Sequence, residues 1–148
     1  MATTTGTLLV YDSWKREMQN KNVDIDSDTF IVGLSTSAYT PNINTHEVLA
    51  DITNEVSGNG YARQTLASVT LTEPSLGTWR FDSADPVFTA SGGSIVARHW
   101  WMFNDTSTTP LDILAFTGVL DDTPADVTTT DGNTLTMQVN TSGYTELS

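Results

Sequence analysis

The 148-residue chain has no cysteine and carries 6 Lys plus Arg against 18 Asp plus Glu, a formal charge of −12 at pH 7. This length suits one domain, which buries roughly 68–70% of its unfolded surface, and the missing cysteines exclude disulfides, thiol nucleophiles and cysteine-ligated zinc and fit folding in a reducing cytoplasm. Because the acidic field repels phosphate backbones, we expect no nucleic-acid partner.

The N-terminal residues MATTTG lack the basic and apolar regions of a signal peptide, and no apolar run is long enough to cross a membrane. We therefore expect no membrane partner. One domain over residues 1–148 is predicted, with residues 1–7 as a flexible arm. Residues 8–21 form the one helix candidate, because Tyr11, Trp14 and Met18 make a narrow apolar stripe. Asp12 or Ser13 can cap a shorter version of this helix. We expect this stripe to pack on a sheet. Lys15, Arg16 and Lys21 are interpreted as its solvated face.

Strands dominate the rest of the sequence. The 26 Thr residues suit half-exposed pleated strands, and apolar and polar side chains alternate in several segments separated by Gly-containing turns. Residues 45–52 are expected to form an ordered loop with one helical turn opened by Thr45 or His46, and residues 123–131 the loosest segment. Together these elements predict a mainly β fold, an antiparallel two-sheet sandwich of jelly-roll or Ig-like type with one short N-terminal helix. The strand segments are 28–35, 62–72, 78–82, 86–90, 94–103, 112–120 and 133–140.

No metal or cofactor is predicted. Asp24, Asp26 and Asp28 have the spacing of the first ligands of a calcium loop. However, Thr29 stands where Gly is needed and Ser35 where Glu is needed, so a solvated turn is favoured. His46 and His99 lack metal-site spacing, and His99 is expected to be neutral with one hydrogen bond.

No catalytic residue is predicted either. The chain has no GxSxG or SxxK motif and no P-loop. Paired acids such as Asp82 with Asp85, or Asp121 with Asp122, are interpreted as turn residues rather than as a glycosidase pair.

The strongest predicted strand has two apolar faces. Ile95, Ala97, His99, Trp101 and Phe103 share one face, while Val96, Arg98, Trp100 and Met102 share the other. The second face is too apolar for water alone. Either the helix over residues 8–21 covers it, which is favoured, or another protein chain does, since aromatic residues, Met and Arg are enriched at interface cores. The candidate interface residues are therefore Tyr39, Arg98, Trp100 and Met102.

The segment 36–66, TSAYTPNINTHEVLADITNEVSGNGYARQTL, resembles one found in small virion structural proteins of tailed bacteriophages. The likeness extends along most of the chain, although the run 99–102 is richer in tryptophan than is usual for such proteins. Its other positions are Asp28, Thr29, Asp85, Ala97, Arg98, Asp105, Thr106, Pro110, Leu111 and residues 143–148.

This resemblance implies a non-enzymatic phage virion structural protein. The expected role is a capsid decoration or cement protein that binds the major capsid protein on the outer surface of the head, after assembly in the host cytoplasm, and self-associates as a dimer or trimer. A tail or neck component is the first alternative. A carbohydrate-binding module with Trp100 or Tyr39 as a stacking platform is the second.

Overall fold

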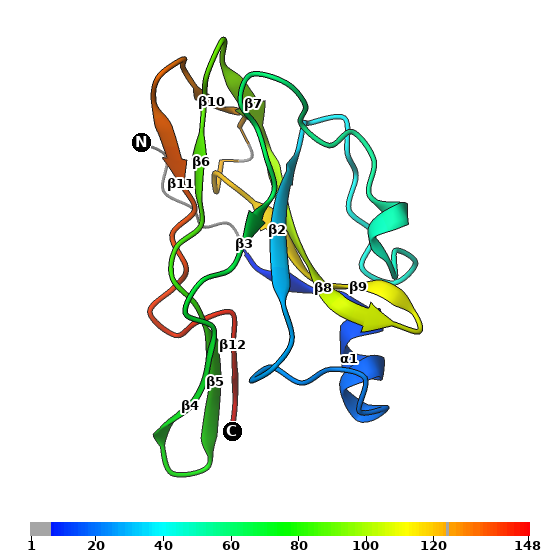
Figure 1. Cartoon of the computed structure of the whole chain (residues 1–148). Helices are drawn as coiled ribbons and strands as arrows, with labels where there is room; N and C mark the ends of the chain where they lie inside the picture. Colours follow the sequence, from blue (N-terminus) through cyan, green and yellow to red (C-terminus); the bar gives the residue numbers. More distant parts are fainter. Residues whose placement is uncertain (1–6, 124) are drawn as a thin grey trace.

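The computed structural model describes residues 7–123 and 125–148 and shows a mainly β protein with several antiparallel sheets and one α-helix (Figure 1). The predicted β class and the single N-terminal helix are confirmed. Apart from Thr7, the predicted arm lies outside the described residues. None of the helices in the described ranges is long and apolar enough to span a membrane.

The largest sheet has five strands in the order β1-β9-β8-β2-β3, all antiparallel to their neighbours. Strand β2 pairs along its whole length with β8, from Phe30 opposite Asn104 to Ser35 opposite His99. Strand β2 and the first half of β8 carry buried side chains on both faces, which explains why these strands lie inside the sheet rather than at its edge. The bounds are β1 (Leu9–Val10), β2 (Phe30–Ser35), β3 (Gln64–Thr65), β8 (His99–Thr108) and β9 (Leu111–Val119).

Three smaller antiparallel sheets complete the β structure. Strand β5 (Thr78–Asp82) lies between β4 (Thr70–Ser75) and β12 (Thr145–Leu147). Strand β6 (Val87–Thr89) pairs with β11 (Thr134–Thr136), and β7 (Ile95–Ala97) pairs with β10 (Val127–Thr129). Figure 1 shows the sheets β6–β11 and β4–β5–β12 on one side of the five-stranded sheet and the segment 36–62 on the other.

Helix α1 (Asp12–Gln19) is shorter than the predicted helix over residues 8–21. Its start is delayed because Leu9 and Val10 pair with β9 instead. The predicted caps are also wrong: Tyr11 occupies the N-cap without a side-chain hydrogen bond, and the Ser13 hydroxyl donates to the carbonyl of Leu114 at 3.0 Å. This bond and the buried Trp14 fix the helix against the sheet, as the apolar stripe predicted.

Two hydrophobic cores lie on opposite faces of the five-stranded sheet. The first joins Phe30, Val32 and Leu34 of β2 to residues from α1 and the smaller sheets. The second joins Trp101 and Phe103 of β8 to the segment 39–52. Alternate side chains of β2 and β8 therefore serve different cores. The other main contributors are Trp14, Phe81, Phe88, Leu135 and Tyr144 in the first core, and Tyr11, Tyr39 and Leu114 in the second.

Two of the predicted long strands are interrupted. Residues 94–103 split at Arg98 into β7 and β8, and the alternation changes phase there, so Ile95 and Ala97 join the same core as Trp100 and Met102. Residues 62–72 split near Ser68, whose backbone adopts a φ of 53°. The segment 123–131, expected to be the loosest, contains the short strand β10.

The loop over residues 45–52 is ordered and contains one helical turn, as predicted. The turn is a 3₁₀ helix over Leu49–Asp51 whose N-cap is Val48, so neither Thr45 nor His46 opens it. The Asp51 carboxylate instead accepts hydrogen bonds from the backbone N–H groups of Glu47 and Val48 at 2.8 and 3.1 Å. These bonds lower the pKa of Asp51.

Candidate interaction surface

Three of the four predicted interface residues lie in the interior. Tyr39, Trp100 and Met102 are each 5% exposed or less. Arg98 is half-buried, and its guanidinium pairs with Asp126 at 2.8 Å. The apolar second face of β8 is therefore covered internally. Internal cover is the favoured alternative, but the helix is not the only element that provides it. Trp14 of α1 lies in the same core as Trp100, and the Tyr144 ring lies 6.3 Å from the Trp100 ring.

The adjacent tryptophans of β8 each lie over a glycine of a neighbouring strand. Trp101 is opposite Gly33 of β2, and Trp100 is opposite Gly118 of β9. A Cβ on Gly118 would come within 2.7 Å of the Trp100 Nε1, and one on Gly33 would overlap the Trp101 ring. Both glycines are thus required for the close approach of an indole. The tryptophan-rich run has a packing role on both faces of the sheet.

Residues 39–52 of the segment that carries the phage resemblance cover the second core, whereas Val56, Tyr61 and Leu66 of the same segment contribute to the first. The Tyr39 hydroxyl lies 2.9 Å from the Tyr11 hydroxyl and 3.0 Å from Nδ1 of His46. Glu55 accepts hydrogen bonds from the Tyr61 hydroxyl at 2.9 Å and from the Arg63 guanidinium at 2.7 Å. The residues of the motif thus form two separate hydrogen-bonded groups, and these bonds fix how the segment folds against the sheet.

His99 is the one described residue with a buried side-chain nitrogen that lacks a hydrogen-bond partner, its Nδ1. The predicted single hydrogen bond is not found at this atom. Burial lowers the pKa of His99, the nearby Arg98 guanidinium lowers it further, and Asp126 opposes them. Both histidines also contact Tyr39, with ring centroids 5.7 Å away for His46 and 5.8 Å for His99.

The three aspartates with calcium-like spacing form a turn before β2. One Asp28 carboxylate oxygen accepts the backbone N–H of Asp24 at 2.8 Å and the Asn104 amide at 2.6 Å. The Asp24 carboxylate accepts the backbone N–H of Asp26 at 3.1 Å. Within residues 7–123 and 125–148, no group of three or more His, Cys, Asp or Glu side chains is placed to hold a metal ion.

The described arginines are all engaged in intramolecular ion pairs with carboxylates. Arg16 contacts Glu17 and Glu47, so most of the predicted cationic face of α1 is neutralised, and Lys15 pairs with Asp12. The remaining pairs are Arg63 with Glu55, Arg80 with Glu146, and Arg98 with Asp126. The acids in excess over the cations therefore determine the electrostatic character of the surface.

A hollow of about 380 Å³ lies beside Trp100 and Tyr144. Its lining mixes the apolar side chains of Leu8 and Met137 with polar groups such as Asp122. Trp100 and Tyr39 are both too deeply buried to offer an open ring face to a sugar. Among the four tryptophans it is Trp79, 47% exposed, that presents a ring to solvent.

Three exposed apolar residues lie on the β4–β5–β12 sheet. Leu76 is 98% exposed in the turn between β4 and β5, Trp79 is 47% exposed on β5, and Leu147, which is 60% exposed, lies opposite Trp79 on β12. We call these three residues the hairpin patch. In Figure 1 the hairpin extends away from the rest of the molecule, toward the lower left.

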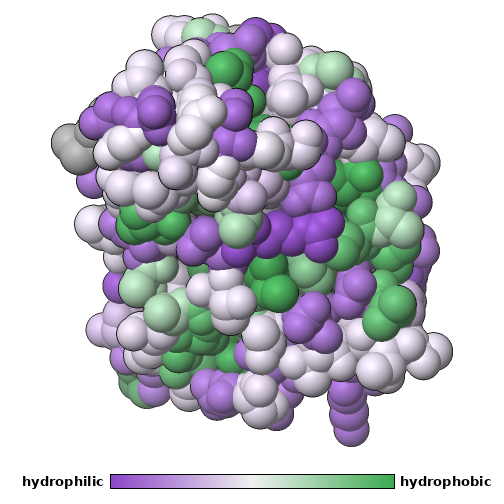
Figure 2. Space-filling model, turned by 45° about the horizontal axis from the view of Figure 1, so that its top comes forward, coloured by the Kyte–Doolittle hydropathy of each residue, from purple (hydrophilic) through white to green (hydrophobic). Residues whose placement is uncertain are grey.

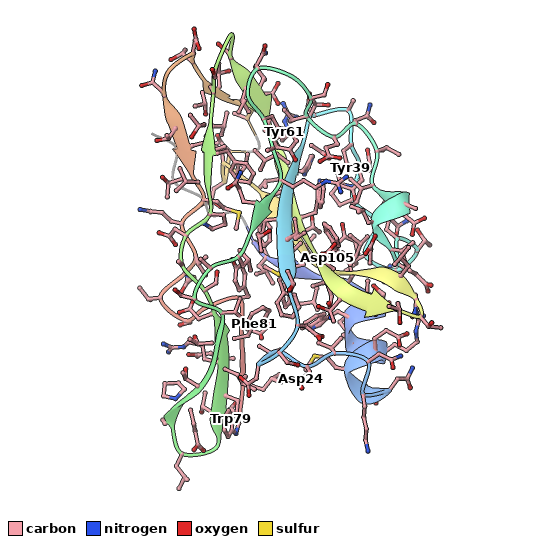
Figure 3. All side chains as sticks on the ribbon, viewed as in Figure 1. Asp24, Tyr39, Tyr61, Trp79, Phe81 and Asp105 are labelled. Carbon is pink, nitrogen blue, oxygen red and sulfur yellow. The ribbon has the colours of Figure 1, made fainter. Side chains whose placement is uncertain are left out.

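Trp79 of the hairpin patch lies on the face of β5 that also carries a residue of the first core, but outside that core. Trp79 and Phe81 are two residues apart and so share a face of the strand. Phe81 packs against Phe30, Phe116 and Tyr144, with ring centroids 5.1–5.9 Å apart, whereas Trp79 lacks such cover. Figure 3 shows Trp79 near the free end of the hairpin and Phe81 closer to the body.

On the face drawn in Figure 2, hydrophobic surface is divided into separate areas by polar side chains. In the hairpin patch, by contrast, two exposed apolar residues are neighbours, because Trp79 and Leu147 lie opposite each other on adjacent strands. Sequence reasoning missed it, since the alternation of Trp79 with Phe81 indicates a buried face. The available signal was Leu76, an apolar residue beside Gly77 in a two-residue turn.

No family model, no curated protein and no solved structure matches this chain. The candidate site is therefore defined by its geometry and by the character of its side chains.

Proposed function

We propose that the protein is a non-enzymatic structural component of a tailed-phage particle, and that it is a capsid decoration or cement protein. In this role it binds the major capsid protein on the outer surface of the head and stabilises the shell, without a cofactor. The proposal includes an antiparallel two-sheet sandwich of jelly-roll or Ig-like type and a dimer or trimer on the particle.

The observation that carries this proposal is the hairpin patch. Trp79 and Leu147 stand side by side on a projecting sheet. Tryptophan is one of the residue types enriched at the centres of protein interfaces. The patch is small and lies on a projecting hairpin, so it suits contact with another protein surface better than enclosure of a small substrate.

A second support is the role of the residues that carry the phage resemblance. Within this segment, Tyr39 is hydrogen-bonded to His46, and Tyr61 is hydrogen-bonded to Glu55. A motif of this kind preserves a scaffold, and the scaffold then presents its binding surface elsewhere. On a symmetric shell, many weak contacts of one kind together give stable attachment.

The experiment that tests the proposal is densitometry of a stained gel of purified particles. Hundreds of copies per particle support head decoration, whereas about six or twelve copies, as expected for a ring of cyclic symmetry, indicate the tail or neck. Complete absence of the protein from particles would contradict both locations and favour a free binding module.

A second measurement separates a stabilising role from passive attachment. Particles that lack the protein should release their DNA at a lower temperature than complete particles, because each bound copy adds contacts that only the intact shell can make. Release at the same temperature would rule out a cement function.

A further inference from the structure

The charges around the hairpin patch restrict what can bind there. The strands β4, β5 and β12, with the turn between β4 and β5, carry the carboxylates Glu73, Asp82 and Glu146 but the single cation Arg80. Arg80 is already occupied, since its Nε donates to Glu146 at 2.8 Å. The Glu73 carboxylate lies at the free end of the hairpin, where it accepts the backbone N–H of Gly77 at 2.7 Å. Arg80, Asp82 and Glu146 alternate with Trp79 and Leu147 along their strands and so project from the opposite face of the sheet. The Glu73 carboxylate at the free end of the hairpin is thus the charge nearest the apolar patch.

A second copy of the chain is a poor occupant of this surface. Self-docking would bring together two copies that each carry a formal charge of −12, and like charges across an interface oppose binding. A dimer or trimer of this protein would have to use a different surface.

Addition of a strand at the nearer edge of the sheet is also disfavoured. Strand β4 contains Pro74, which has no N–H to donate, and its pairing with β5 is irregular between Thr72 and Ser75. On the other edge, β12 is three residues long. The side-chain face that carries Trp79 and Leu147 is therefore the surface available for docking.

We propose that the hairpin patch docks face-on to a different protein whose surface offers an apolar depression rimmed by Lys and Arg. This inference rests on the proposed function and defines the partner surface. The depression receives Trp79 and Leu147, and the cations meet Glu73 and the negative field of a protein with a formal charge of −12. Each contact is weak by itself because the patch is small, so firm attachment requires an array of such sites.

The test uses the full chain and a defined probe. The probe is a fluorescently labelled helical peptide with leucines on one face and lysines on the other, and its binding is followed by fluorescence anisotropy. A second peptide has glutamates in place of the lysines. The variants are Trp79→Ser and Leu147→Ser, with Leu111→Ser as the matched control, because Leu111 is a 62% exposed leucine on β9, outside the patch.

The wild-type protein and Leu111→Ser should bind the lysine peptide equally, and Trp79→Ser and Leu147→Ser should bind it about tenfold or more weakly. Binding should also weaken as salt rises from about 0.05 to about 0.5 M. Equal binding by all four proteins would show general attraction to an acidic surface and overturn the proposal. Equal affinity for the glutamate peptide would overturn it as well.

Sedimentation velocity of the free proteins completes the test. A wild-type dimer that Trp79→Ser abolishes would assign the patch to a second copy and overturn the proposal. Particles assembled without the protein are then incubated with each variant. If wild type and Trp79→Ser bind them equally, the docking inference fails while the particle function stands. If the peptide results hold but no particle binds the wild type, the particle function fails while the partner chemistry stands.

Discussion

Trp101 lies directly opposite Gly33 in the pairing of β8 with β2, and its indole occupies the space that a side chain at Gly33 would fill. The indole N–H donates to the Ser35 hydroxyl at 2.9 Å, and the Arg63 guanidinium lies 5.4 Å from the ring centroid. The second core is therefore built around one indole held by contacts on several sides.

The first prediction concerns this glycine. Gly33→Ala should lower the free energy of unfolding by about 1–3 kcal/mol, because the new methyl group forces the Trp101 ring out of its position. Urea unfolding followed by circular dichroism measures the loss. The double variant Gly33→Ala/Trp101→Leu should lose less than the sum of the two single losses, since the smaller side chain removes the clash. Strict additivity would mean that the two residues do not compete for space.

The second prediction separates the buried from the exposed tryptophan. Trp100→Ser should destabilise the protein by about 3–5 kcal/mol, because it opens a cavity between Tyr144 and the sheet. Trp79→Ser should change stability by about 0.5 kcal/mol or less, as is usual for surface positions. Thermal melts of both variants give the comparison. A Trp100→Ser protein as stable as the wild type would indicate that Trp100 is exposed, which would contradict the arrangement of the first core.

The third prediction concerns mild acid. The pKa of His99 is lowered in the folded state from an ordinary value of 6.5, so the unfolded chain binds a proton more readily. The contribution of His99 to stability is therefore complete above about pH 6.5 and declines as the pH falls below that value. Urea unfolding at several pH values between 7.5 and 5.5 should show this decline in the wild-type protein and a smaller one in His99→Gln.

His46→Gln serves as the control for that experiment, because it removes the other histidine that contacts Tyr39 and leaves His99 in place. Its decline should resemble that of the wild type. The range stays above pH 5 because Glu17 and Asp51, whose pKa values are lowered from 4.5 and 3.8, lose their contributions only in stronger acid. A decline in His99→Gln as large as in the wild type would assign the effect to another group.

The fourth prediction concerns Asp51. Asp51→Asn should lower stability by about 1–2 kcal/mol, because a neutral amide accepts the Glu47 and Val48 N–H groups less strongly than a carboxylate does. Asp26→Asn makes the same charge change on an exposed turn residue and should be nearly neutral. Hydrogen exchange at the two amides reports the local effect. Unchanged protection there would show that the carboxylate does not hold the turn.

Much of the β structure could be predicted from the sequence, because alternation directly reports which side chains share a face of a strand. It identified β2, β5 and β9 to within a few residues. It failed where the backbone departs from regular pairing. The bend at Arg98 reverses the faces of the preceding residues, and no composition signal marks it. The helix start moved because Leu9 and Val10 find a partner in β9, a contact distant in sequence.

The candidate interface was the least predictable feature. Trp100 and Met102 are apolar on a face that a single strand would expose, and only the packing of α1 and Tyr144 shows that this face is covered. Conversely, Trp79 follows the pattern of a core residue, and only the length of the hairpin relative to the core exposes it. Periodicity gives the direction of a side chain from its strand, but not what lies beyond it.

The placement of adjacent β8 residues in different cores has a mechanical consequence for unfolding. Trp100 anchors one core and Trp101 the other, so a disturbance of either residue strains the backbone of the strand that both cores share. We therefore expect the two cores to unfold together. Tryptophan emission and far-ultraviolet circular dichroism should accordingly trace a single, superimposable denaturation curve.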